Sequence, residues 1–96
     1  KIHAKIISIN KFGSLHLNIT HSAWDEFGVE LNDKFYLFFE DEEIEVPFVV
    51  TFGDVDKGNS LILKDDYGRV EVALNQDSFA KRYKVKIGDE IIIEKK

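Results

Sequence analysis

Residues 14–20 read Ser-Leu-His-Leu-Asn-Ile-Thr and alternate between polar and apolar side chains without a break. A β-strand points successive side chains to opposite faces, so this period of two is typical of a strand that buries one face. Leu15, Leu17 and Ile19 are expected to face the core, with the polar residues on the other side. The isoleucine-rich segment 2–9 and the turn at 10–13 come before this strand, which predicts a β-hairpin.

The rest of the chain predicts more short strands and two helical turns. Ser22 is the expected cap of a helix at 23–27, and Asp77 the expected cap of a helix at 78–83. The acidic run from 40 to 45 is interpreted as a solvated hairpin tip. Further strands are expected at residues 34–40, 45–52, 60–64, 69–74 and 90–94. About seven short strands predict an all-β fold, a small antiparallel β-barrel with two helical turns.

Length and composition limit the class of protein. The 96 residues are interpreted as one domain, and the absence of cysteine excludes disulfide frameworks and cysteine-based metal sites or nucleophiles. The three histidines lack metal-ligand spacing and no nucleophile–base pair is recognisable, so no metal site and no catalytic residue are predicted. The chain has no methionine, even at its first position, which predicts a domain processed or cut from a longer chain.

Charge distribution argues against nucleic-acid binding. Residues 23–80 contain fifteen acidic and four basic side chains, whereas contact with phosphates needs clustered lysine and arginine. No apolar run is long enough to span a bilayer and no signal-peptide pattern opens the chain, so a cytoplasmic protein is predicted.

Eight phenylalanines are the strongest oddity of the composition. Most should be core residues, but Phe12 lies beside the first turn and Phe52 at a predicted strand end. A phenylalanine at a barrel mouth can stack on a flat ring, so these two are candidates for ligand binding, with ordinary core packing as the alternative.

Three segments, in this order, resemble one family. Residues 6–19 resemble its Ile-Asp-x-Phe-Gly-Asn-Leu-x-x-Asn-Ile hairpin, and residues 51–58 resemble its Tyr/Thr-Phe-x-Asp-Val-x-x-Gly segment. Residues 65–75 resemble its Asp-Ser-x-Gly-x-Leu-Glu-Ile-Ala-x-Asn hairpin. The family is the S-adenosylmethionine (SAM) hydroxide adenosyltransferases, or SAM hydrolases, which are related to the fluorinase and chlorinase enzymes. The match is to their C-terminal β-barrel domain.

The resemblance implies a role in hydrolysis of SAM to adenosine and L-methionine. SAM would be the substrate, with no further cofactor. In the family it lies between the N-terminal α/β domain of one subunit and the barrel of its neighbour in a trimer. The groups that activate the attacking water belong to the N-terminal domain, so the 96-residue chain alone is expected to be inactive.

The resemblance also implies site residues. Phe52 matches the aromatic that stacks on adenine, and Phe12 the neighbouring aromatic wall. Ser14 stands at the asparagine that hydrogen-bonds the adenine edge, and Asn10 at the aspartate that receives the substrate ammonium. Asp66 and Tyr67 stand at the positions that hold the substrate carboxylate. Asn75 and Gln76 match the segment whose backbone meets adenine.

Asn10, Ser14 and Asp66 depart from the family pattern. Asn10 lacks the charge that pairs with an ammonium, and Asp66 adds one where a carboxylate binds. One hypothesis links the two changes, with Asp66 taking over the ammonium; the alternative is that SAM binding is lost or altered. Two alternative functions stay open. One is a non-catalytic barrel that binds a protein or a ligand, and the other is an OB-type barrel that binds single-stranded nucleic acid.

Overall fold

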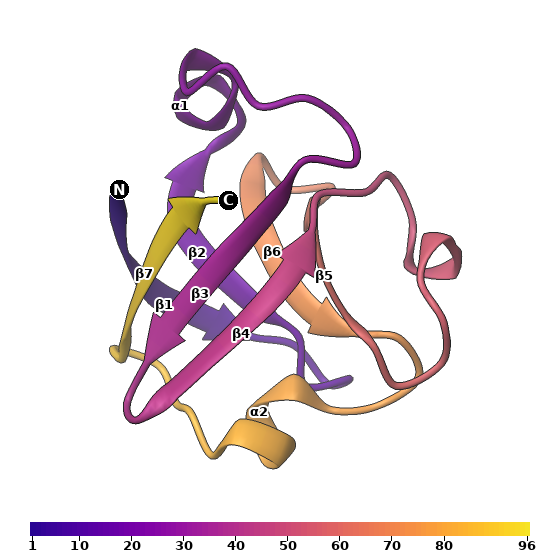
Figure 1. Cartoon of the computed structure of the whole chain (residues 1–96). Helices are drawn as coiled ribbons and strands as arrows, with labels where there is room; N and C mark the ends of the chain where they lie inside the picture. Colours follow the sequence, from indigo (N-terminus) through magenta and orange to yellow (C-terminus); the bar gives the residue numbers. More distant parts are fainter.

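Seven antiparallel strands curl into a nearly closed barrel (Figure 1). The structure, a computed structural model, describes all of residues 1–96. The strands run in the spatial order β4-β3-β7-β1-β2-β6-β5. Their bounds are β1 (Ile2–Ile9), β2 (Leu15–Thr20), β3 (Lys34–Phe39), β4 (Glu42–Pro47), β5 (Ser60–Lys64), β6 (Arg69–Leu74) and β7 (Glu90–Lys95).

The two outer strands of this order, β4 and β5, meet and close the barrel. Phe48, just after β4, forms an isolated parallel bridge with Ile62 of β5. The N–H of Val49 donates to the carbonyl of Ile62 at 2.8 Å. Closure satisfies backbone groups that would otherwise form an exposed sheet edge. The predicted all-β barrel is confirmed.

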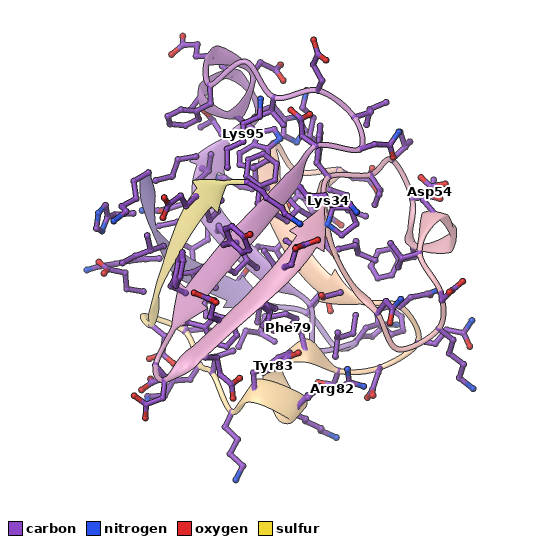
Figure 2. The ribbon with its side chains drawn as sticks, viewed as in Figure 1. Lys34, Asp54, Phe79, Arg82, Tyr83 and Lys95 are labelled. Atoms are coloured by element: carbon purple, nitrogen blue, oxygen red, sulfur yellow. The ribbon has the colours of Figure 1, made fainter.

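One helix covers each end of the barrel (Figure 1). From α1 (His21–Glu26), the fully buried Trp24 packs against Phe35 with ring centroids 5.1 Å apart. From α2 (Phe79–Tyr83), the fully buried Phe79 packs against Phe39 at 5.6 Å. Figure 2 shows Phe79 and Tyr83 side by side below the strands. Aromatic side chains thus fill the two openings that seven short strands leave.

Strand β2 is buried on both faces over its first half. Leu15, Leu17 and Ile19 face the core as predicted, with at most 5% exposure. Ser14 and His16 were expected to face outward, yet they are only 2% and 9% exposed. Asp65 of the β5–β6 turn contacts His16 from 49 positions away, which a local pattern does not reveal.

The helix caps differ from the prediction by one or two residues. The Thr20 hydroxyl, rather than Ser22, accepts the N–H of Ala23 at 3.1 Å and caps α1. The Ser78 hydroxyl accepts the N–H of Lys81 at 3.1 Å and caps α2. The predicted cap, Asp77, instead accepts from the N–H of Ser78 and pairs with Arg82.

Most of the acidic run 40–45 lies in a strand rather than in a hairpin tip. The prediction placed the hairpin tip over residues 40–45, but β4 already begins at Glu42 and ends at Pro47. Carboxylates can lie on the solvent-exposed face of a strand, and Glu45 forms an ion pair with Lys96 at 2.8 Å. Phe52 was predicted to end this strand and instead begins the short 3-10 helix η1 (Phe52–Asp54).

The turn between β1 and β2 packs directly on α2 through Gly13. Gly13 has a φ of 82°, and a Cβ there would lie 1.9 Å from Oγ and 2.9 Å from Cα of Ser78. Its carbonyl accepts the N–H of Ala80 at 3.0 Å. Both the left-handed backbone and the absence of a side chain are therefore required at this position.

We expect Gly13→Ala to lower the free energy of unfolding by about 3 kcal/mol, because backbone strain and overpacking add. Gly28→Ala is the matched control, since Gly28 has a φ of 71° and a Cβ added to it would have nothing within 4 Å. The control should lose only about 1 kcal/mol. Urea unfolding of both variants checks this, and equal losses would contradict the packing role of Gly13.

Candidate ligand-binding site

A cavity of about 610 Å³ opens where the β1–β2 turn, η1 and the segment after β6 meet. Four of the predicted site residues line it together: Phe12, Phe52, Asn75 and Gln76. The remaining lining residues are Leu74, Asp77 and Ser78. The cavity therefore unites three segments that are far apart in the sequence, with an aromatic side chain from each of two turns.

Phe52 is fixed by the turn that contains it. The Asp54 carboxylate accepts the N–H groups of Val50 and Thr51 at 3.2 and 3.1 Å, which closes the turn around the ring. Phe52 packs against a small second core between β5 and β6 and stays half-buried. Figure 2 labels Asp54 on this loop, at the side of the barrel. Phe12, by contrast, is 68% exposed.

Asn75 and Gln76, the two amide residues of the cavity, differ in which hydrogen-bonding groups are left unpaired. The N–H of Asn75 donates to Asn59 at 2.9 Å and its carbonyl accepts from Gly58 at 2.8 Å. Its side-chain Nδ2 donates to the carbonyl of Val55. Gln76 adopts a φ of 61°, and its N–H donates to no group of the chain. Gln76 thus has an unpaired main-chain donor and lines the cavity.

Two smaller hollows continue from this cavity. One of about 260 Å³ is lined by Phe52, Asp65, Asp66 and Glu71, among others. Another of about 410 Å³ contains Asn10, His16, Asp65, Tyr67 and Arg69. Phe52 lines both the cavity and the 260 Å³ hollow, and Asp65 lines both smaller hollows, so the three form a run of neighbouring hollows along the barrel surface.

Ser14 lines none of these hollows. It is buried, and its hydroxyl hydrogen-bonds the Glu71 side chain. Asn10 lines the third hollow but serves the turn: its Oδ1 accepts the N–H groups of Phe12 and Ser14 at 2.9 and 3.1 Å. Seven of the eight predicted residues therefore border the run of hollows, and Ser14 lies beneath it.

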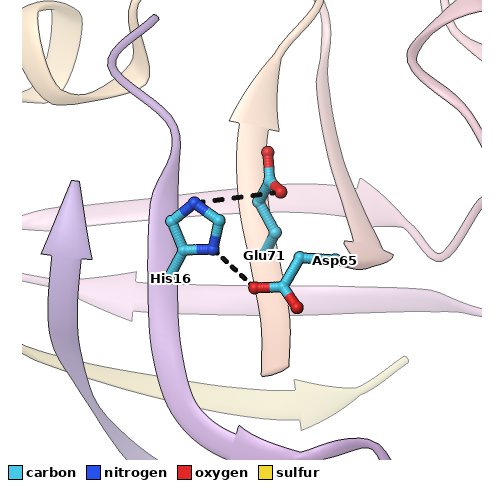
Figure 3. Close-up of side chains that lie close together, drawn as sticks. All are labelled: His16, Asp65 and Glu71. Atoms are coloured by element: carbon cyan, nitrogen blue, oxygen red, sulfur yellow. Dashed lines mark hydrogen bonds and ion pairs between the residues drawn. The ribbon is translucent and has the colours of Figure 1, made fainter. Parts of the chain in front are cut away.

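Beneath the run lies a cluster of buried polar side chains that the sequence pattern did not predict (Figure 3). His16 Nδ1 lies 2.6 Å from Asp65 Oδ2, and His16 Nε2 lies 4.0 Å from Glu71 Oε1. All three residues are at most 9% exposed. His16 and Asp65 are 49 positions apart. No local motif signals their contact, which depends on β2 and β6 being neighbours.

The two carboxyl groups of the cluster are shifted in opposite directions. Burial acts to raise the pKa of Asp65, but hydrogen bonds from the N–H of Arg69, from His16 and from the N–H of Tyr67 outweigh it and lower that pKa. Burial raises the pKa of Glu71, although His16 and the Ser14 hydroxyl oppose it. Asp65 is thus stabilised as an anion, and Glu71 has far less compensation for its burial.

An aromatic-lined cavity beside a buried polar cluster, on the side of a nearly closed barrel, is the candidate ligand-binding site of this β-barrel domain. Residues 4–92 match the family described as the SAM hydroxide adenosyltransferase C-terminal domain. The chain belongs to this family.

Two solved structures share the fold. One is an uncharacterized conserved protein from Thermotoga maritima, with a TM-score of 0.91 and 29% identity. The other is a conserved hypothetical protein from Thermus thermophilus, with a TM-score of 0.72 and 19% identity. The alignments cover 97% and 95% of this chain but only 36% and 34% of those proteins. The chain therefore spans about a third of their length. None of its own helices is long and apolar enough to cross a membrane.

We expect Glu71→Gln to gain stability relative to the unchanged protein as the pH rises above the ordinary glutamate value of 4.5. A carboxyl whose pKa is higher in the folded chain binds its proton more tightly there. Its contribution to stability is then present at acid pH and is lost as the pH rises through the folded-state pKa. Glutamine does not titrate, so the variant avoids this loss.

Urea unfolding midpoints of both proteins, measured from about pH 4 to about pH 8, check the prediction. Glu43→Gln is the matched control, because it removes one carboxylate from an exposed position of β4. If the unfolding midpoints of Glu71→Gln and the unchanged protein differ by the same amount at every pH, the prediction is wrong.

Proposed function

We propose that this chain is the substrate-binding and oligomer-contact domain of an enzyme that hydrolyses SAM to adenosine and L-methionine. One observation carries the proposal: Phe12, Phe52, Asn75 and Gln76 border a single cavity in a chain that belongs to the SAM hydroxide adenosyltransferase C-terminal domains. These are the residues that the family resemblance assigns to the adenine end of the substrate.

Adenine suits the large cavity in chemistry and size. A purine needs apolar contact with its faces and hydrogen bonds at its edge. Phe52, half-buried and held by the Asp54 turn, offers the rigid face, and Phe12 offers the second wall. The unpaired N–H of Gln76 supplies a donor for a ring nitrogen. Ser14 lies below the cavity, so the adenine edge is met by Gln76 instead.

The amino-acid end of the substrate occupies the two smaller hollows. Asp66 carries the negative charge for the ammonium, in place of Asn10, whose side-chain oxygen already accepts two N–H groups of its turn. Tyr67 lines the hollow next to it, together with Arg69, and both can donate hydrogen bonds to the substrate carboxylate.

The chain supplies no catalytic residue in this proposal. Hydroxide is activated by an N-terminal α/β domain, and a neighbouring subunit of a cytoplasmic homotrimer closes the site. Phe12 and Tyr67 are 68% and 85% exposed at the rim of the hollows, which supports a site completed by another chain. Alone, the 96 residues bind weakly and have no turnover, because an open half-site buries little of a ligand.

The test of the proposed function is turnover by the full-length natural protein that contains this domain. Incubated with SAM and no added halide, it should release adenosine and L-methionine in equal amounts, detected by chromatography, whereas the isolated domain should release neither. Adenosine binding without turnover would instead favour a non-catalytic binding barrel, and absence of both would refute the proposal.

Replacing Phe52 by alanine should weaken adenosine binding of the full-length protein by about tenfold or more, because stacking on a base contributes about 1–3 kcal/mol. Phe27→Ala is the matched control. Phe27 is 52% exposed at the end of α1 and lines none of the three hollows. Isothermal titration with adenosine measures both variants, and an unchanged affinity in Phe52→Ala would exclude the stacking role.

A further inference from the structure

Helix α2 is attached to all three segments that line the aromatic cavity. The β1–β2 turn, which carries Phe12, is joined to it through Gly13, whose carbonyl accepts the N–H of Ala80 at 3.0 Å. Residues 75–78 lead directly into the helix. The loop that carries Phe52 is the third segment, and it is far from α2 in the sequence. Its attachment to the helix therefore needs a contact made in the folded chain.

One side chain of α2, Arg82, makes this contact. Its Nη1 donates to the carbonyl of Gly58 at 2.9 Å, across 24 positions of the chain. Figure 2 labels Arg82 on α2, on the same side of the barrel as Asp54 of the loop. No other hydrogen bond joins α2 to the loop of residues 52–59. The position of this loop relative to the helix thus depends on one guanidinium group.

The same guanidinium holds the segment that precedes α2. Its Nη2 donates to Asp77 Oδ2 at 2.6 Å, while Asp77 Oδ1 accepts the N–H of Ser78 at 2.7 Å. The N–H of Ser78 and the Arg82 side chain lower the pKa of Asp77, so its carboxyl group is an anion at neutral pH. Asp77 lines the cavity directly after Gln76, which has the unpaired main-chain donor. Arg82 therefore joins the segment with this donor to the loop with the aromatic ring.

Hydrogen bonds within the loop connect Gly58 to the aromatic ring. The N–H of Gly58 donates to the carbonyl of Asn75 at 2.8 Å, so both main-chain groups of Gly58 are engaged. Asn75 Nδ2 donates to the carbonyl of Val55 at 2.9 Å, and the N–H of Val55 donates to the carbonyl of Phe52 at 3.3 Å. A shift of Gly58 away from α2 would consequently move the Phe52 ring relative to the segment after β6.

We propose that Arg82 is a positioning residue of this site, which fixes the Phe52 ring relative to the Gln76 donor and so sets the affinity for the adenine group. This inference rests on the proposed function. Arg82 does not line the aromatic cavity; it borders a separate hollow of about 450 Å³. It acts through Gly58 and Asp77, without contact to the substrate.

Bridging two acceptors depends on the shape of a guanidinium group. Its nitrogens donate in a fixed planar geometry, whereas a lysine ammonium is a single point of charge on a flexible chain. The Arg82 side chain is 40% exposed, and exposed ion pairs contribute little to folding stability. A small displacement of a group that positions the substrate, by contrast, has a large effect. Loss of Arg82 should therefore change ligand affinity much more than stability.

The test compares Arg82→Ala and Arg82→Lys in the full-length protein, with Lys81→Ala as the matched control. Lys81 lies on the same helix, and its side chain forms no ion pair or hydrogen bond. Isothermal titration should show an affinity for adenosine that is about tenfold lower in Arg82→Ala, intermediate in Arg82→Lys and unchanged in the control. With SAM as the substrate, KM should rise in Arg82→Ala while kcat stays within about twofold.

Amide exchange of residues 52–59, followed by mass spectrometry without ligand, gives a second readout. It should be faster in Arg82→Ala than in the unchanged protein and in the control, because the loop has lost its attachment to α2. Urea unfolding midpoints of the three variants, measured alongside, should differ little from that of the unchanged protein.

Several results would overturn the inference. If the unchanged protein and Arg82→Ala bind adenosine equally well, the clamp is not needed and the proposed function stands. Full affinity in Arg82→Lys would show that the positive charge alone suffices, and this variant remains decisive should Arg82→Ala fail to fold. A lower unfolding midpoint with an unchanged KM would make Arg82 a structural residue only. If the unchanged protein binds neither adenosine nor SAM, the proposed function fails and this inference fails with it.

Discussion

One carboxylate, Asp65, determines where the parts of the candidate site lie. Its Oδ1 accepts the N–H groups of Tyr67 and Arg69, which closes the β5–β6 turn. Its Oδ2 meets His16 Nδ1 at 2.6 Å and ties that turn to β2. The same contact orients the imidazole, so the turn, the covered face of β2 and the lone pair on Nε2 depend on one side chain. The hydrogen bonds that lower the pKa of Asp65 keep it anionic, and this anion accepts all of them.

Periodicity predicted the fold because the barrel repeats one local rule. The alternation in residues 14–20 set the core face of β2, and a strand count with turn residues between strands led to a closed sheet. The predicted helix caps and hairpin tip were wrong where more than one residue or structure satisfies the same local requirement. Thr20 and Ser22 can both cap a helix, and carboxylates at 42–45 suit an exposed strand as well as a tip. Tertiary packing makes these choices, and local chemistry permits either.

The candidate site was predictable only where its residues sit in recognisable segments. Phe12, Phe52 and Gln76 come from three such segments, and they border one cavity. His16 and Glu71 were missed, because each looks like an ordinary polar position of an alternating strand. Their burial arises from a turn that folds over the outer face of the barrel, and no sequence window contains both the turn and β2. Polar residues on the outside of a small barrel therefore need the topology before they can be interpreted.

The charges at positions 10 and 66 acquire a joint physical meaning from this network. With an aspartate at position 10, the atom facing His16 Nε2 would be an acceptor, and the imidazole would carry a proton there. The imidazole would then carry a hydrogen on the nitrogen that lies nearest Glu71. Asn10 instead faces His16 Nε2 with its amide donor, so this nitrogen accepts and gives no hydrogen to the Glu71 carboxylate. Relative to the family pattern, a negative charge is absent from the β1–β2 turn and present at Asp66, which lines the same hollow as Glu71. The two departures therefore move the acidic side chains of the candidate site away from the β1–β2 turn and toward β6, and this is why they have to be interpreted together.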